Sequence, residues 1–211
     1  MADKEILIFV EGPSDKVFLE AYLYFLEDIP IKNFKVKDVT GKDNLSKRLL
    51  EIEKYDKTLI IFDADKDYES NKKEILSKTQ QKITEEQIFL FPNNQDDGDL
   101  ETLLLEIAKH TKFLKCFEGY LECIKSKEHY KPIKNISKSK WYAYLEVFEL
   151  QNFFKDKRNK NDKKNEEKII IDDKGKIRKE YKEEYEKLKE VIDFNSNSLI
   201  PLKDFLGQFA K

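Results

Sequence analysis

Cysteine is scarce in this sequence, with only Cys116 and Cys123 among 211 residues. The two form no CxxC pair and have no pair of histidines nearby, which argues against a structural zinc site. A chain of this length buries enough surface to fold without a disulfide or a metal. We therefore expect both residues to be buried free thiols in a reducing compartment.

Long apolar segments are also lacking. No apolar run approaches the ~20 residues needed to cross a bilayer. The first residues, MADKE, lack the charged and apolar regions of a secretory signal. Both observations predict a cytoplasmic protein with no membrane partner.

The sequence also lacks an excess of positive or negative charge. The 40 basic and 42 acidic side chains leave a net charge of −2, so overall charge gives no argument for nucleic-acid binding. A nucleic-acid partner would have to be held by local basic patches or by bridging metal ions.

Four short segments with strand-like patterns, each followed by a helical pattern, occupy residues 1–110. The segments are Ile6–Val10, Phe34–Val39, Thr58–Phe62 and Gln87–Phe91. Continuous apolar runs such as Ile6–Val10 are typical of strands buried on both faces, whereas Phe34–Val39 alternates like a strand more exposed on one face. The alternation predicts an α/β domain, a parallel sheet of about four strands flanked by helices. In such sheets the ligand site lies at the carboxyl ends of the strands.

Candidate N-cap residues follow the strands and mark where each helix is expected to begin. Ser14 is the predicted cap of the first helix and Asp99 that of the last helix in this part. Asp43 or Asn44 would cap a helix that carries Leu45 to Ile52. The boundaries of the helices are predicted from these caps.

Residues 111–211 predict a mainly helical extension packed on the sheet domain or on a partner chain. Helices are expected over residues 110–124, 138–154, 181–191 and 199–209. A densely charged segment near residues 155–180 predicts a flexible loop. The apolar faces of these helices are also compatible with a homodimer.

Acidic residues stand at the ends of two strands. Glu11 follows the first strand, and the run Asp63, Asp65 and Asp67 follows the third. Since parallel strands end at one edge, these carboxylates can converge, and they would repel one another unless a cation intervened. Carboxylates and water are the ligands that Mg²⁺ prefers, and Mn²⁺ accepts the same set. Gly12 would let a ligand approach the backbone closely.

A second acidic cluster follows the fourth strand and should lie near the same edge. Asp99 and Glu101 are its best candidates for a second metal position. The alternative is an ordinary helix start, with Asp99 as the cap and Glu101 in the first turn. Lys42, after the second strand, could hold a phosphate, or it could be a surface lysine.

Two segments, ILIFVEGPSDKVFLEAYL and TLIIFDADKD, resemble the signature motifs of Toprim domains. The resemblance implies that Glu11 matches the catalytic glutamate of that family. Asp63 and Asp65 match its metal-binding aspartates, and Asp67 matches the accessory one. Asp15 matches a further acid of the branch that contains the OLD nucleases. FPNNQDDGDLETLLLEIA and the closing VIDFNSNSLIPLKDFLGQF resemble a Toprim-like group known as DUF3226.

This resemblance implies a Mg²⁺- or Mn²⁺-dependent nuclease or related phosphotransfer enzyme acting on DNA or RNA. Glu11 would act as base or metal ligand, and Asp63 and Asp65 as metal ligands. The chain departs from the larger members of the family in two respects. No motif places a tyrosine as a DNA-cleaving nucleophile, and there is no ATPase motif of the GxxxxGK[ST] type.

Two other families share parts of the DxDxD pattern. Haloacid-dehalogenase-like phosphatases also place Asp-x-Asp after an apolar strand, but on the first strand of the chain and followed by Thr or Val. The spacing of Asp63, Asp65, Asp67 and Glu74 fits part of an EF-hand. There, Tyr68 stands where glycine is required, and a strand precedes the loop where a helix is needed.

The main alternative to an enzyme is a non-catalytic module that binds nucleic acid or a nucleotide. An aromatic segment with basic residues after it could stack on bases and contact phosphates. It comprises Trp141, Tyr142, Tyr144, Phe148, Phe153 and Phe154, then Lys155, Lys157, Arg158 and Lys160. Spacings of three and four instead favour a core or dimer face for the aromatic residues.

Overall fold

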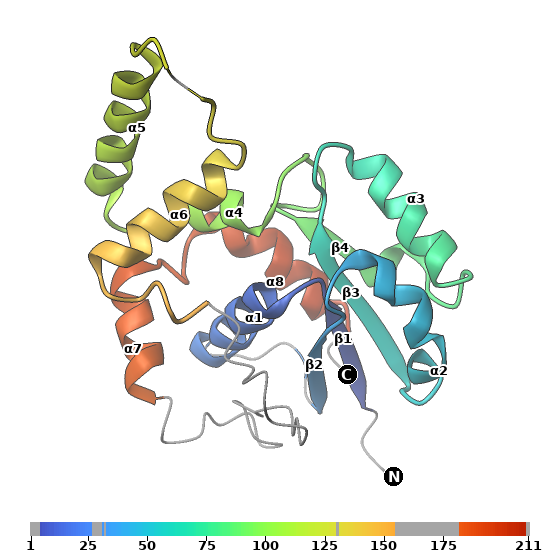
Figure 1. Ribbon diagram of the computed structural model, residues 1–211. Coiled ribbons are helices and arrows are strands. Elements are labelled where there is room, and N and C mark those ends of the chain that lie inside the picture. Colours follow the sequence, from blue (N-terminus) through green and yellow to red (C-terminus); the bar gives the residue numbers. More distant parts are fainter. Residues whose placement is uncertain (1–4, 27–30, 32, 130, 155–181, 210–211) are drawn as a thin grey trace, which may run out of the picture.

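A four-stranded parallel sheet is the centre of the computed structural model, which describes residues 5–26, 31, 33–129, 131–154 and 182–209 (Figure 1). Its strands are β1 (Ile6–Val10), β2 (Phe34–Asp38), β3 (Lys57–Asp63) and β4 (Ile88–Phe91). Their order is β2-β1-β3-β4, and every neighbouring pair is parallel. The predicted α/β fold is thereby confirmed. β1 and β3, the two strands followed by the candidate acids, are direct neighbours.

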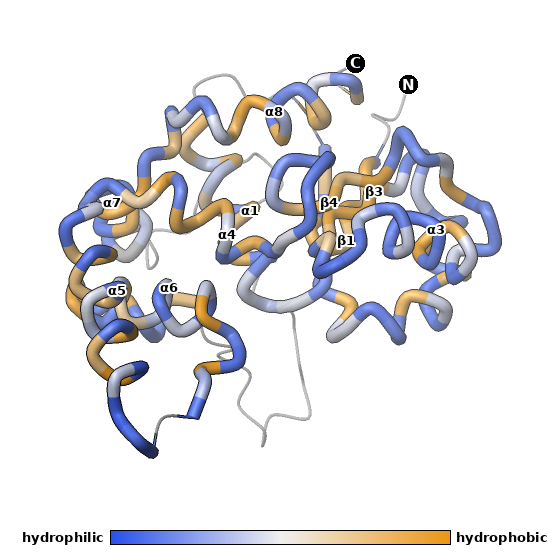
Figure 2. The backbone as a smooth tube through the Cα atoms, turned by 90° about the horizontal axis from the view of Figure 1, so that it is seen from above, coloured by the Kyte–Doolittle hydropathy of each residue, from blue (hydrophilic) through white to orange (hydrophobic). Residues whose placement is uncertain are grey.

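The two faces of the sheet bury separate hydrophobic clusters. Alternation along β1 sends Ile6, Ile8 and Val10 to one cluster and Leu7 and Phe9 to the other. The first cluster also contains side chains of α1 (Pro13–Phe25), α4 (Leu100–Glu106) and α8 (Ile200–Gly207). The second contains those of α2 (Leu49–Ile52) and α3 (Tyr68–Lys78). The strands therefore form an apolar layer between helices, orange in Figure 2.

Helix α1 begins two residues earlier than predicted. Its N-cap is Gly12, with Pro13 in the first turn, so Ser14 lies inside the helix and the predicted cap was wrong. The Asp15 carboxylate accepts a hydrogen bond of 2.6 Å from the Gly12 amide. Proline suits the first turn because its missing N–H would have no helical partner there. Asp99, by contrast, is the N-cap of α4 as predicted.

The segment after β2 is not the single helix expected from its caps. Gly41, at φ 100°, precedes a 3₁₀ helix, η1 (Lys42–Arg48), which leads into the four-residue α2. Asn44 uses its side-chain amide to donate to the Thr40 carbonyl rather than to cap. Lys42 is therefore fixed in a tight turn directly beyond the sheet.

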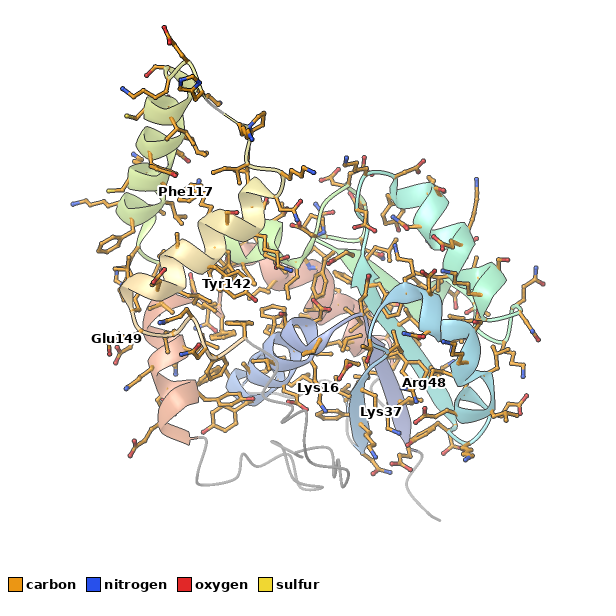
Figure 3. All side chains as sticks on the ribbon, viewed as in Figure 1. Lys16, Lys37, Arg48, Phe117, Tyr142 and Glu149 are labelled. Atoms are coloured by element: carbon orange, nitrogen blue, oxygen red, sulfur yellow. The ribbon has the colours of Figure 1, made fainter. Side chains whose placement is uncertain are left out.

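Among the described residues, the C-terminal half adds four α-helices and a short 3₁₀ turn. These are α5 (Thr111–Lys125), α6 (Ile136–Val147), α7 (Lys182–Val191), η4 (Asn197–Leu199) and α8. In Figure 3, Phe117 lies on α5 and Tyr142 on α6, two helices that pack against each other. Helix α6 also packs on α4. Side chains of α6 and α7 join the same cluster as β1 and β4, so residues 1–110 and 111–211 share a core.

The aromatic segment belongs to this core. Trp141, Tyr144, Phe153 and Phe154 are buried, while Tyr142 and Phe148 pack against the cluster from its margin. Base stacking on the buried rings is thus excluded, and the alternative of a core face is confirmed. The helix itself is shorter than predicted, ending at Val147, with Glu149 at a positive φ of 59°. Lys155, Lys157, Arg158, Lys160 and the charged segment near 155–180 lie outside the described residues.

The expectation of buried thiols was wrong. Cys116 and Cys123 both lie on the exposed side of α5 and are free. Their spacing does put them on one face of the helix, but Leu114 and Leu121 occupy the buried face. Within the described ranges, the chain has no helix with the length and apolar character needed to span a bilayer.

Candidate functional site

Acidic side chains gather where β1 and β3 end. Val10 of β1 pairs with Ile61 of β3, so Glu11, which directly follows β1, and Asp63, the last residue of β3, emerge at the same edge of the sheet. This edge faces the loops that lead into α1, α3 and α4 (Figure 1). The predicted convergence of carboxyl ends thus brings together residues that are 52 positions apart in the sequence.

Burial and mutual repulsion raise the pKa values of three of these acids. Burial is the main cause for Glu11, whose pKa is raised further by Asp65 and lowered by Lys42. The pKa of Asp15 rises to about 7, mainly because of burial, with an additional contribution from Glu11. Burial also raises the pKa of Asp63 well above its usual range, and Asp15 and Glu11 add to the effect. Burial and the neighbouring carboxylates thus make the charged form of each acid less favourable.

Glu101, in the first turn of α4, is the fourth member of this group. Its side chain is only 10% exposed. Burial raises its pKa, while Lys138 lowers it. The α4 turn is tied to the sheet because the Leu100 amide donates a 2.8 Å hydrogen bond to Asp63 Oδ1. We call Glu11, Asp15, Asp63 and Glu101 the acidic cluster.

The Asp65 carboxylate is paired with Lys42. Lys42 Nζ lies 2.8 Å from Asp65 Oδ2 and also donates to the side-chain oxygen of Asn71. Asn71 in turn donates to the Ala64 carbonyl, so the lysine is held from two sides. Asn71 was not predicted as a site residue; its only signal was its place one turn after Asp67 in a largely polar helix.

The remaining predicted acids form local hydrogen bonds. Asp67 is the N-cap of α3 and accepts from the Ser70 amide at 2.9 Å. Asp99 caps α4, accepting from the amide and the hydroxyl of Thr102. These bonds satisfy helix amides that would otherwise lack partners. The capping alternative therefore accounts for the positions of both residues.

Gly12 lies beside the cluster, but its amide is engaged by Asp15. Its φ of −141° is ordinary extended backbone, which any residue adopts. A methyl group at this position would lie 3.4 Å from Asp15 Oδ2, an ordinary contact. Neither the backbone conformation nor a close contact therefore requires glycine at this position.

The donor chemistry of the acidic cluster fits a hard divalent cation. It offers carboxylate oxygens, and within the described part of the chain Glu11 Oε2 is buried with no hydrogen-bond partner. A cation would relieve both the repulsion and this unmet oxygen. In the arrangement seen here, no group of three or more His, Cys, Asp or Glu side chains among the described residues is placed so that it could hold a metal ion. Binding would therefore require rotation of the carboxylates toward the ion.

A two-way backbone contact fixes the loop that carries Asp65. The Asp65 amide donates to the Gly98 carbonyl and the Gly98 amide to the Asp65 carbonyl, both at 2.7 Å. Asp65 has φ 55° and Gly98 has φ 144°, a value that strongly favours glycine. The β3–α3 and β4–α4 loops are thus joined directly beyond the sheet.

We expect Gly98→Ala to destabilise the protein by about 1–3 kcal/mol. The new Cβ would meet the Pro92 side chain at 3.0 Å in addition to the unfavourable φ. Urea unfolding measures the loss. Gly119→Ala is the control, because no atom lies within 4 Å of its Cβ position and it lies inside helix α5. Equal stability of the two variants would contradict the role assigned to Gly98.

Comparison with known proteins gives one family. The family model described as "Protein of unknown function (DUF3226)" matches residues 5–210. No curated protein and no solved structure shows significant similarity to the chain.

Proposed function

The chain belongs to the DUF3226 family, and from that premise we propose that it carries out divalent-metal-dependent phosphodiester chemistry on nucleic acid. The observation that carries the proposal is the acidic cluster at the carboxyl ends of β1 and β3. Buried carboxylates that raise one another's pKa are costly to the fold in the absence of a cation. Such arrangements are found more often at functional sites than elsewhere on proteins.

The resemblance of the segments around Glu11 and Asp63 to Toprim motifs supports the same reading. In this proposal Asp63 and Glu11 hold Mg²⁺ or Mn²⁺, with Asp15 and Glu101 as neighbouring acids. Asp65 joins them on release from Lys42. A bound cation would polarise the phosphate and lower the pKa of an attacking water.

Glu11, which matches the catalytic glutamate of Toprim domains, is the residue we assign to proton transfer when it does not hold the ion. Its raised pKa brings its titration closer to neutral pH, where an acid or base works best. Lys42, once displaced from Asp65, is within reach of a phosphate at the same edge. Asn71 keeps the lysine at this edge in either state.

A second candidate is a module that binds nucleic acid or a nucleotide without turnover. Its supporting observation is the ion pair of Lys42 with Asp65, which neutralises one of the predicted metal ligands. In that case the lysine and the cluster would hold a ligand, and no bond would be cleaved.

Calorimetric titration with Mg²⁺ and Mn²⁺, followed by a cleavage assay, tests the proposal. Purified protein is incubated with plasmid, single-stranded DNA or RNA in the presence of Mg²⁺, Mn²⁺ or EDTA. We expect metal binding at millimolar concentration or below, and products that EDTA abolishes. Metal binding without products on any substrate would favour the non-catalytic module. Absence of binding to either metal would refute the metal-dependent function.

A further inference from the structure

A lysine from the helical half reaches the acidic cluster. Lys138 lies in the first turn of α6, the helix that packs on α4. Its Nζ is 3.7 Å from Glu101 Oε1. The helix comes from a part of the chain beyond the four strands, and it lies beside α4, the helix that carries Glu101 (Figure 1).

The charge of Lys138 acts on two members of the cluster. It lowers the pKa values of Glu101 and Asp15, in both cases against the larger effect of burial. Lys42 acts in the same way on Glu11. The cluster therefore has two basic neighbours, one from each half of the chain.

Lys138 differs from a structural ion-pair residue in its exposure and its contact distance. Its side chain is 54% exposed, and 3.7 Å is longer than the ~2.8 Å of a direct charge-assisted hydrogen bond. Lys140, two residues along the same helix, is 16% exposed and lies 2.6 Å from Glu118. An exposed, loosely paired lysine adds little stability. Its ammonium keeps donors available for another anion.

Lys42 is the less accessible of the two basic residues. Its side chain is 13% exposed, and Asp65 and Asn71 both hold its ammonium. Lys138 can meet an incoming anion without breaking comparable bonds. Beside a set of carboxylates, an anion needs such a basic residue to offset repulsion.

We propose that Lys138 binds a backbone phosphate of a nucleic acid at the acidic cluster, so that the helical half contributes directly to substrate binding. The inference rests on the proposed function, and it assigns Lys138 as a residue that contacts the substrate. Phosphate recognition by a lysine is independent of sequence, so this contact would position the strand without selecting bases.

Binding of a fluorescently labelled single-stranded DNA oligonucleotide tests this role. Anisotropy is measured over a range of salt concentrations, with Ca²⁺ in place of Mg²⁺, for wild type, Lys138→Ala, Lys138→Arg and Lys140→Ala. We expect Lys138→Ala to weaken binding by about three- to tenfold and to reduce the salt slope by about 0.7. Lys138→Arg should restore both quantities, and Lys140→Ala should match wild type.

Three results would overturn the inference. These are unchanged binding by Lys138→Ala, an equal loss in Lys140→Ala, and no binding of the oligonucleotide by wild type. Mg²⁺ titration without DNA separates this inference from the proposed function. Lys138→Ala should bind the metal as wild type does, and weaker metal binding would mean that Lys138 acts through the metal site instead. If wild type binds no metal, both proposals fall.

Discussion

Asp63→Asn is expected to reduce metal-dependent cleavage by roughly 10²- to 10³-fold, the loss typical when one group that stabilises the transition state is removed. Asparagine keeps the oxygen that accepts from the Leu100 amide, so α4 should stay attached to the sheet. What the variant loses is the negative charge that a cation would meet. Initial rates with Mg²⁺ and calorimetric titration of the metal measure both effects.

Asp56→Asn is the matched control for this prediction. Asp56 also accepts a hydrogen bond from a backbone amide, that of Glu5 at 3.0 Å, but at the opposite edge of the sheet. Its replacement should leave metal binding and cleavage unchanged. If the two variants behaved alike, the carboxyl edge would have no special part in the chemistry.

Asp15→Asn is expected to stabilise the metal-free protein at pH 8 by about 2–4 kcal/mol. The pKa of Asp15 is about 7 in the folded protein, against 3.8 for an ordinary aspartate. The folded state thus favours the protonated acid. Its contribution to the free energy of unfolding is fully present below pH 3.8 and is lost as the pH rises through about 7. Asparagine stays neutral and can still accept from the Gly12 amide.

Urea unfolding in EDTA at pH 5 and at pH 8 measures this effect. The gain from Asp15→Asn should be larger at pH 8 than at pH 5. Mg²⁺ should stabilise wild type at pH 8 more than it stabilises the variant, since the ion offsets the same charge. Asp43→Asn is the control. Asp43 is exposed and Lys78 lowers its pKa, so its replacement should not stabilise the protein. A gain in both variants would indicate a general charge effect.

Local signals in the sequence were sufficient for the sheet and for the acids at its edge. Continuous apolar runs such as Ile6–Val10 are typical of strands buried on both faces. Their alternation with helical patterns predicts a parallel sheet with helical crossover connections. Once the strands are identified, the residue that follows each strand at its carboxyl end is also known. Glu11 and Asp63 could be placed at one edge because parallel strands end on the same side, whatever their order.

Only the tertiary structure decided how the acids are used. Asp67 and Asp99 bond to amides of their own helices, and Asp65 pairs with Lys42, whereas Asp15 and Glu101 join Glu11 and Asp63. A carboxylate in the sequence is compatible with any of these partners. Burial and the packing of distant elements choose among them, as when α6 brings Lys138 to Glu101. The sequence by itself therefore determined the sheet and the chemical type of its edge. The order of strands, the members of the acidic cluster and its basic neighbours depended on long-range packing, which has no local signal.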